Sequence, residues 1–210
     1  MINLDVLSGL KRPLANVLLC GVVMVSLQGC VEMVLGGAVL GTFAAADRRT
    51  LGAQTEDKAI GLKASARMSD VAGENGHVNV NSFNRKVLLT GEVNNEQIKA
   101  AVEREVRTIE GVESVANELA IGDPSNFTAR SNDVYVTGKI KASFIDDKRL
   151  FANSIKVVTE RGNVYLMGRV TQREGGLAGE VASGVNGVQR VIKVFEYITE
   201  EELGQISTTK

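Results

Sequence analysis

The stretch Val164-Tyr165-Leu166-Met167-Gly168-Arg169-Val170 decides the fold, because the chain contains a second copy of it. The earlier copy is Val87-Leu88-Leu89-Thr90-Gly91-Glu92-Val93, 77 residues upstream. Two more pairs of similar segments keep the same order at offsets of 78 and 76 residues: Lys63–Ser65 with Lys141–Ser143, and Ile109–Val115 with Val185–Val191. Three collinear matches indicate an internal duplication with units of about 65 residues each, near the lower limit for a domain that folds alone.

Both units show the same succession of hydrophobic patterns. In the second unit, Val136, Ile140 and Phe144 recur every four residues, as on one face of a helix. Two β-branched runs follow, and the turn-forming Glu160-Arg161-Gly162-Asn163 between them predicts a hairpin. A helix over 172–185 and a strand over 188–198 complete the unit. The first unit is expected to form a helix over 57–68, strands over 77–83 and 86–93, a helix over 95–109 and a strand over 112–121. The order α-β-β-α-β predicts an α+β fold.

Four glycines recur at matching positions, and we expect structural roles for them. Gly91 and Gly168 lie inside strands, where a glycine marks a bulge or a close approach of another backbone segment. Gly111 and Gly187 follow the second helix of each unit, where a left-handed C-cap favours glycine.

The first 29 residues are typical of a bacterial lipoprotein signal peptide. Lys11 and Arg12 form a positive region before the apolar run Leu14–Leu27. The segment Leu27-Gln28-Gly29-Cys30 resembles a lipobox, whose cysteine becomes acylated and begins the mature chain. Cys30 is therefore the expected lipid attachment site, and residues 30–56 the expected mobile tether. The alternative is an uncleaved transmembrane helix, since no lysine or arginine occurs from residue 14 to 46.

The composition excludes several kinds of site. His77 is the only histidine and Cys20 and Cys30 are the only cysteines, too few for a structural zinc site with four Cys or His ligands. Removal of Cys20 with the signal peptide would leave no disulfide. His77 precedes a strand, and we expect it on the surface rather than in a catalytic site. The sequence thus predicts no enzyme, no cofactor and no metal site, and the net charge of −1 gives no sign of nucleic-acid binding.

The repeated V-x-L-x-G-x-V, followed by a helix and then (I/V)-x-G-V-x-x-V, resembles the BON domain. Two such domains behind a lipobox, with Asp47-Arg48-Arg49-Thr50-Leu51-Gly52 between, are similar to the dual-BON outer-membrane lipoproteins. The resemblance implies a three-stranded sheet with two helices on one face and no catalysis. It also implies a role in outer-membrane integrity and outer-membrane protein assembly, with the assembly machinery as a partner. The ligand that the resemblance implies is anionic phospholipid, bound through the first helix of the second domain.

The two units differ in charge. Residues 59–122 carry 7 Lys and Arg against 9 Asp and Glu, and residues 134–199 carry 10 against 6. Anionic headgroups attract each nearby Lys or Arg by about 1 kcal/mol, so only the second domain suits an anionic membrane. We expect a first BON domain over 57–122, a linker over 123–133, a second BON domain over 134–199 and a polar tail over 200–210.

The first helix of the second domain carries the candidate lipid-binding residues. Tyr135, Ala142 and Ile145 fall on a face separate from the core face, with Lys139 and Lys141 beside them. Apolar residues flanked by lysines are typical of helices that lie at a membrane surface. The resemblance places the lipid-contacting positions of the family on Tyr135 and Ile145.

Two alternatives remain for this strip. It could pack the two domains together, or it could bind a partner protein as part of a periplasmic adaptor. We expect a monomer anchored in the outer membrane and facing the periplasm.

Overall fold

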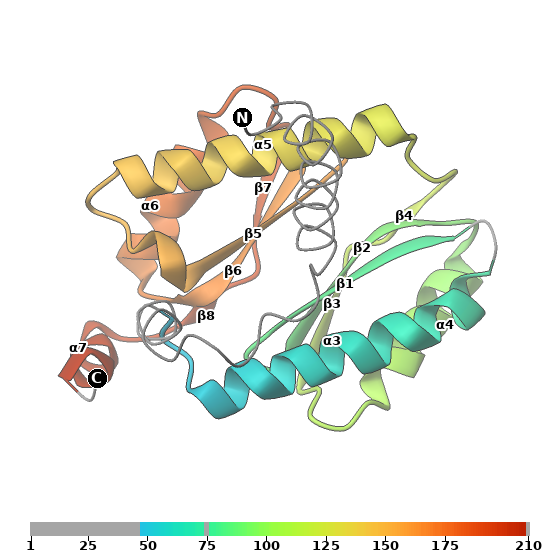
Figure 1. Ribbon diagram of the computed structural model, residues 1–210, viewed down its shortest axis with the longest axis horizontal. Helices are drawn as coiled ribbons and strands as arrows, with labels where there is room; N and C mark the ends of the chain where they lie inside the picture. The colour runs from blue at the N-terminus through green and yellow to red at the C-terminus, as the bar shows by residue number, and fades with distance from the viewer. Residues whose placement is uncertain (1–46, 74–75, 209–210) are drawn as a thin grey trace, which may run out of the picture. The chain divides into compact units, whose positions relative to one another are not determined.

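The computed structural model describes residues 47–73 and 76–208 (Figure 1). The first repeat consists of α3 (Leu51–Ala72), β1 (His77–Phe83), β2 (Lys86–Val93), α4 (Glu96–Arg107), β3 (Ser114–Asn117) and β4 (Ala120–Ile121). The second repeat consists of α5 (Phe127–Asp146), the 3₁₀ turn η1 (Ala152–Ser154), β5 (Ile155–Glu160), β6 (Asn163–Val170), α6 (Gln172–Ser183), β7 (Arg190–Lys193) and β8 (Glu196–Tyr197). The helix α7 (Glu200–Thr208) follows. The predicted α+β fold and its duplicated α-β-β-α-β order are confirmed. The expected signal peptide, Cys30 and residues 30–46 lie outside the described residues.

The repeated stretch forms the central strand of each sheet. In the first sheet, β1 pairs antiparallel with β2, and β3 and β4 both pair parallel with β2. In the second, β6 pairs in the same way with β5, β7 and β8. The last strand of each repeat is therefore broken in two, where we expected one continuous strand. The break lets Leu119 in the first repeat and Phe195 in the second turn into the core.

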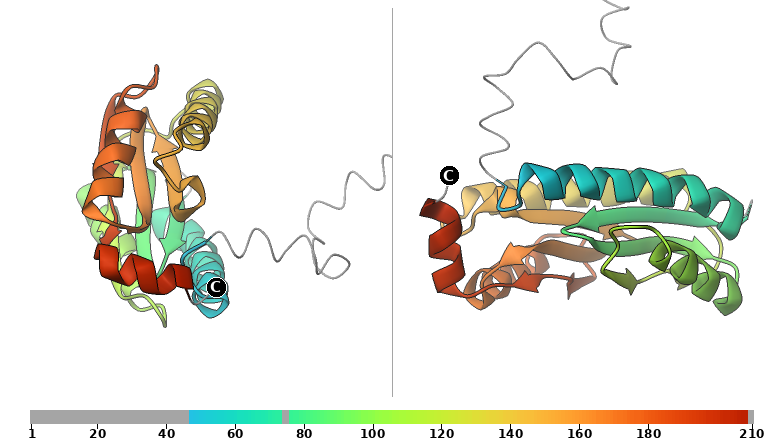
Figure 2. Two further views of the ribbon diagram at one scale, coloured as in Figure 1. Left: turned by 90° about the vertical axis from the view of Figure 1, so that its left-hand side faces the viewer. Right: turned by 90° about the horizontal axis from the view of Figure 1, so that it is seen from below.

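Side chains alternate between two buried faces along each central strand. Val87 and Leu89 of β2 join the core beneath α3 and α4, which cover one face of their sheet (Figure 2). Val164 and Leu166 of β6 do the same beneath α5 and α6. A strand that is buried on both faces has apolar residues at nearly every position. This burial explains why the repeated stretch is almost entirely apolar.

The opposite faces of the two sheets pack against each other. Phe83, Leu88, Tyr165 and Met167 form one buried cluster with residues from both repeats. Hydrogen bonds surround this cluster: Asn84 Nδ2 donates to Glu196 Oε2 over 2.6 Å, and Lys86 Nζ donates to the Phe195 carbonyl oxygen over 3.1 Å. The two domains are thus joined through their sheets.

Both first helices begin earlier than we predicted. Thr50 caps α3, with its hydroxyl accepting a hydrogen bond from the Ala53 amide at 3.1 Å. Asn126 caps α5, with Oδ1 accepting from the Ala129 amide at 2.9 Å. Such side chains satisfy amides at a helix start that have no partner within the helix. The segment 123–133, expected as the linker between the domains, is therefore mostly helical, and residues 51–56 of the expected tether belong to α3.

The expected polar tail also contains a helix. The Glu202 amide donates to Thr199 Oγ1 over 3.1 Å, and Glu202 Oε2 accepts from the Thr199 amide over 2.8 Å. This reciprocal pair is a capping box, which starts α7.

The strand glycines allow a close approach of neighbouring backbone. A Cβ atom on Gly91 would lie 2.0 Å from the His77 carbonyl oxygen, and one on Gly168 would lie 2.4 Å from the Ser154 carbonyl oxygen. The C-cap prediction for Gly111 and Gly187 was wrong, because Thr108 and Gly184 occupy those positions. Gly111 and Gly187 instead lie in the turns that follow, with φ of 89° and 104°.

Candidate functional site

Helix α5 has an apolar surface opposite to the face that it buries. Its buried residues are Asp133, Val136, Ile140 and Phe144. Four large apolar side chains remain exposed: Phe127 (85%), Val134 (73%), Tyr135 (65%) and Ile145 (70%). Together with the exposed Ala142 they lie within an arc of about 100° at 3.6 residues per turn, and we call this set the α5 strip.

Basic side chains lie on both sides of the α5 strip. At helical spacing, Arg130 and Lys141 flank one side and Lys139 flanks the other. Lys141 is exposed and makes no ion pair or hydrogen bond with any residue that the structure describes. Lys139 is half-buried: its Nζ donates to the Asn186 carbonyl oxygen and lies 5.0 Å from the centre of the Tyr135 ring. Lys139 thus holds the Tyr135 ring in a cation–π contact on the helix surface.

The sequence alone did not point to Phe127 and Val134. The Asn126 cap extends α5 by two turns beyond the predicted start at residue 134, and this extension brings Phe127 into line with Val134 and Ile145. The signal was an asparagine directly before a helix-compatible segment, a pattern typical of an N-cap.

The interpretation that the strip packs the two domains together was wrong. Tyr135 and Ile145 remain exposed, whereas the contact between the domains uses Leu88 and Met167 from the sheets. The strip is therefore available to a ligand or a partner.

The segment before α3 contacts both domains. The Arg48 guanidinium makes two hydrogen bonds of 2.7 Å to the Glu174 carboxylate in the second domain and one of 2.9 Å to the Arg169 carbonyl oxygen. Residues 47–56 are therefore held against the domains, and the expectation of a mobile tether was wrong for this part.

Arg49 binds the first domain beside Arg48. Its Nη1 lies 2.6 Å from Asp57 Oδ2, and its guanidinium carbon lies 4.0 Å from the centre of the Phe83 ring. Burial raises the pKa of Asp57. Hydrogen bonds to its carboxylate lower the pKa by a larger amount, and the donors are the Ser82 hydroxyl, the Asn84 and Arg85 amides and the Arg49 guanidinium. The pKa of Asp57 consequently lies below its ordinary value.

His77 lies at a partly buried position, where the sequence predicted one on the surface. Its side chain is only 19% exposed, and its Nδ1 lies 3.0 Å from Oε2 of the fully buried Glu92. Burial raises the pKa of Glu92, but the hydrogen bonds from Ser125 and His77 lower it by a larger amount. The pKa of Glu92 therefore lies below its ordinary value. Burial raises the pKa of nearby Glu160.

The geometry and the repeat agree with one family. The sequence profile of the BON domain matches residues 57–123 and 132–199. The chain belongs to the BON domain family. The α5 strip thus lies on the first helix of the second BON domain, and the capping turns of α5 begin before the matched range.

Three curated relatives match 65–82% of this chain. The outer membrane lipoprotein DolP of Haemophilus influenzae is 38% identical over 82% of this chain and 90% of its own length. A 21 kDa hemolysin of Actinobacillus pleuropneumoniae is 31% identical over 72% of this chain and 79% of its own length. The osmotically-inducible protein Y of Escherichia coli is 28% identical over 65% of this chain and 70% of its own length.

The two BON matches and the similarity to DolP indicate a dual-BON protein that resembles this lipoprotein. Among residues 47–73 and 76–208, no helix has the length and apolar character needed to cross a membrane.

Proposed function

We propose that this protein is an outer-membrane lipoprotein, acylated at Cys30 and facing the periplasm, that binds anionic phospholipid through the α5 strip. Its similarity to a protein named outer membrane lipoprotein over 82% of the chain supports the location. The lipobox-like Leu27-Gln28-Gly29-Cys30 supports the anchor. Through this binding the protein maintains outer-membrane integrity and supports the assembly of outer-membrane proteins.

The exposed α5 strip with its flanking cations is the observation that carries the proposal. Phe127, Tyr135 and Ile145 together offer apolar surface that gains about 25 cal/mol per Å² when it leaves water. Arg130 and Lys141 each add about 1 kcal/mol near anionic headgroups. These two contributions are both available when the helix lies parallel to a membrane surface, as interfacial helices do.

The charge of the whole domain acts in the same direction. The second BON domain carries an excess of four positive charges over residues 134–199, while residues 59–122 carry an excess of two negative charges. An anionic surface therefore attracts the domain that bears the strip and repels the other one. This asymmetry orients the molecule before contact, because electrostatic forces act over about 8–10 Å at physiological ionic strength.

Vesicle flotation of a chain that begins after Cys30 tests the proposal, since removal of the acylation site isolates the contribution of the strip. We expect flotation with vesicles that contain phosphatidylglycerol, little flotation with phosphatidylcholine alone, and weaker binding as salt concentration rises. The double variant Tyr135→Ala with Ile145→Asp is expected to lose binding with an unchanged circular dichroism spectrum.

Leu62→Asp is the matched control, because Leu62 is 75% exposed on α3 of the first BON domain. We expect this variant to float as the wild type does. If the α5 double variant still floated with anionic vesicles, the strip would not be the lipid contact, and a partner protein would remain as its ligand.

A further inference from the structure

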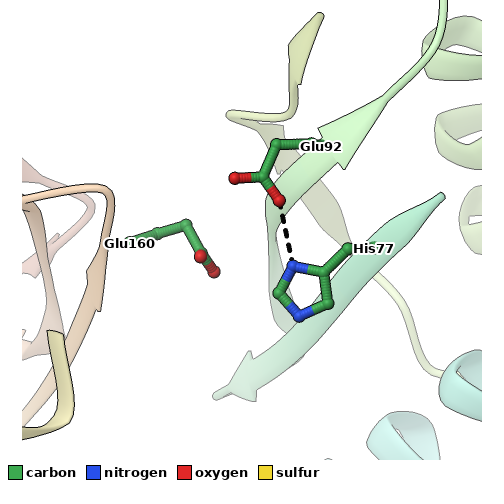
Figure 3. A group of neighbouring side chains, drawn as sticks. All are labelled: His77, Glu92 and Glu160. Carbon is green, nitrogen blue, oxygen red and sulfur yellow. Dashed lines mark hydrogen bonds and ion pairs between the residues drawn. The ribbon is translucent and has the colours of Figure 1, made fainter. Parts of the chain in front are cut away.

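A cluster of possible metal ligands lies where the two BON domains meet. His77 belongs to β1, Glu92 to β2 and Glu160 to β5, so two elements of one sheet and one element of the other contribute (Figure 3). One ligand atom from each side chain can be chosen so that all three lie within 4.8 Å of one another. The sequence predicted no metal site, because one histidine and two cysteines are too few for a zinc site of four Cys or His ligands.

A positive charge would stabilise the two buried carboxyl groups of this cluster. Glu92 is fully buried and Glu160 is 6% exposed, although both carry carboxyl groups. Two carboxylates with oxygens within 4.8 Å of each other repel and need compensation. The Arg161 guanidinium lies 3.8 Å from Glu92 Oε1 and is about half exposed, so it compensates this charge only in part.

One carboxylate oxygen in the cluster is left without a hydrogen bond. Glu160 Oε2 accepts from Asn79 Nδ2 at 2.7 Å and from Thr90 Oγ1 at 3.4 Å. Glu160 Oε1 accepts no hydrogen bond from any residue that the structure describes. Figure 3 shows this carboxylate directed toward the His77 ring and the Glu92 carboxylate. A nine-tenths buried carboxylate that keeps one oxygen free of hydrogen bonds and lies beside an imidazole is an arrangement that a cation completes.

We propose that His77, Glu92 and Glu160 bind a zinc ion that joins the two BON domains. An imidazole with two carboxylates is a donor set that zinc accepts, whereas magnesium and calcium prefer oxygen ligands alone. Zinc binds imidazole nitrogen and carboxylate oxygen at about 2.0–2.2 Å in tetrahedral geometry, which places ligand atoms roughly 3.4 Å apart. Nδ1 of His77 lies 3.0 Å from Glu92 Oε2, and a Glu160 oxygen lies within 4.8 Å of both, so the zinc ion would replace the proton of this hydrogen bond and draw the Glu160 carboxylate closer. A water molecule fills the fourth position.

The proposal gives the metal a structural consequence. His77 and Glu92 lie on the first sheet and Glu160 on the second, so the ion links strands that no covalent segment connects directly. A ligand that binds only the folded protein stabilises it by an amount that rises with the logarithm of its concentration relative to the dissociation constant. Zinc is therefore expected to stabilise the two-domain arrangement, and this effect is independent of lipid binding by the α5 strip.

Metal titration of the mature lipoprotein in detergent tests this inference. The protein is prepared without a histidine tag, so that His77 is its only imidazole. We expect one zinc ion per chain in competition with a zinc indicator, a shift of the single set of histidine ring resonances, and a higher unfolding temperature with zinc than with a chelator. His77→Ala and Glu160→Gln should each weaken zinc binding at least tenfold, as expected for the loss of a ligand.

Glu196→Gln is the matched control, because Glu196 also accepts a hydrogen bond across the domain contact, from Asn84 at 2.6 Å, but lies outside the cluster. This variant should bind zinc as the wild type does. The inference is overturned if the wild type binds no zinc, or if His77→Ala and Glu160→Gln bind zinc as tightly as the wild type. Because Glu160→Gln keeps the size of the side chain, its circular dichroism spectrum should match the wild type.

Discussion

Arg48 and Glu174 form a two-point ion pair across 126 residues of sequence, with both N–O distances at 2.7 Å. The side chains are 9% and 6% exposed, so the pair is buried. It connects the segment that leads toward Cys30 with the first turn of α6 in the second BON domain. The chain is thus fixed on the second domain before it enters the first.

Removal of either partner of this pair should destabilise the protein. Arg48→Ala leaves the Glu174 carboxylate buried without its cation, and loss of one member of a buried pair costs about 3 kcal/mol. Urea unfolding monitored by circular dichroism measures this loss. A double-mutant cycle with Glu174→Gln should show strong coupling, and additive effects of the two substitutions would contradict a direct interaction.

The stability that Asp57 provides should depend on pH. Because the pKa of Asp57 is lower in the folded protein than its ordinary value of 3.8, its contribution is fully present above that value. The contribution should decline as the pH falls through the lowered pKa of the folded state. Unfolding of wild type and Asp57→Asn at several pH values measures this: the wild type should be the more stable protein at pH 7, and the difference should narrow below about pH 3.8. A difference that stays constant down to pH 2 would argue against a role for the charge.

The Asn126 cap should control the first two turns of α5. Asn126→Ala removes the acceptor of the Ala129 amide and should cost about 1 kcal/mol. Hydrogen exchange of the amides near residue 129 should accelerate, while exchange near Phe144 should not change. Asn126→Asp is the conservative control, because aspartate caps helices as well as asparagine does. Equal exchange in Asn126→Ala and Asn126→Asp would contradict the assignment of the cap.

Phe127 should strengthen lipid binding without contributing to stability. The side chain is 85% exposed, so Phe127→Ala should change the free energy of unfolding by less than about 0.5 kcal/mol. Loss of an aromatic side chain from the α5 strip should reduce flotation with anionic vesicles about tenfold, equivalent to about 1.4 kcal/mol of apolar transfer. Leu62→Ala on α3 provides the comparison, and a similar reduction in that variant would show that the effect is not specific to the strip.

The sequence predicted the elements of the fold because their patterns are local and repeated. The two repeated stretches around Gly91 and Gly168 predicted the central strands. The four-residue spacing of Val136, Ile140 and Phe144 predicted the buried face of α5. The helix starts were missed, because one capping side chain, such as Asn126, carries little weight beside a long hydrophobic pattern.

The candidate sites were predicted only where one helix carries them. Tyr135 and Ile145 share a helix, so helical periodicity placed them on one exposed face, and their contact with lipid stays a prediction. The approach of Glu160 to His77 depends instead on how two sheets pack, and no local pattern reports it. The ion pair of Arg48 with Glu174 also depends on tertiary packing, so no local sequence pattern predicted it.

The buried cluster of Phe83, Leu88, Tyr165 and Met167 bears on how the two BON domains can be studied. If the chain were cut between the repeats, each fragment would present half of this cluster to water. A truncated second domain would therefore expose Tyr165 and Met167 as an apolar surface that the intact protein buries. Such a surface promotes non-specific binding to vesicles and self-association of the fragment. Point substitutions in the intact pair of domains avoid this artefact, and membrane adhesion of an isolated fragment would say little about the native molecule.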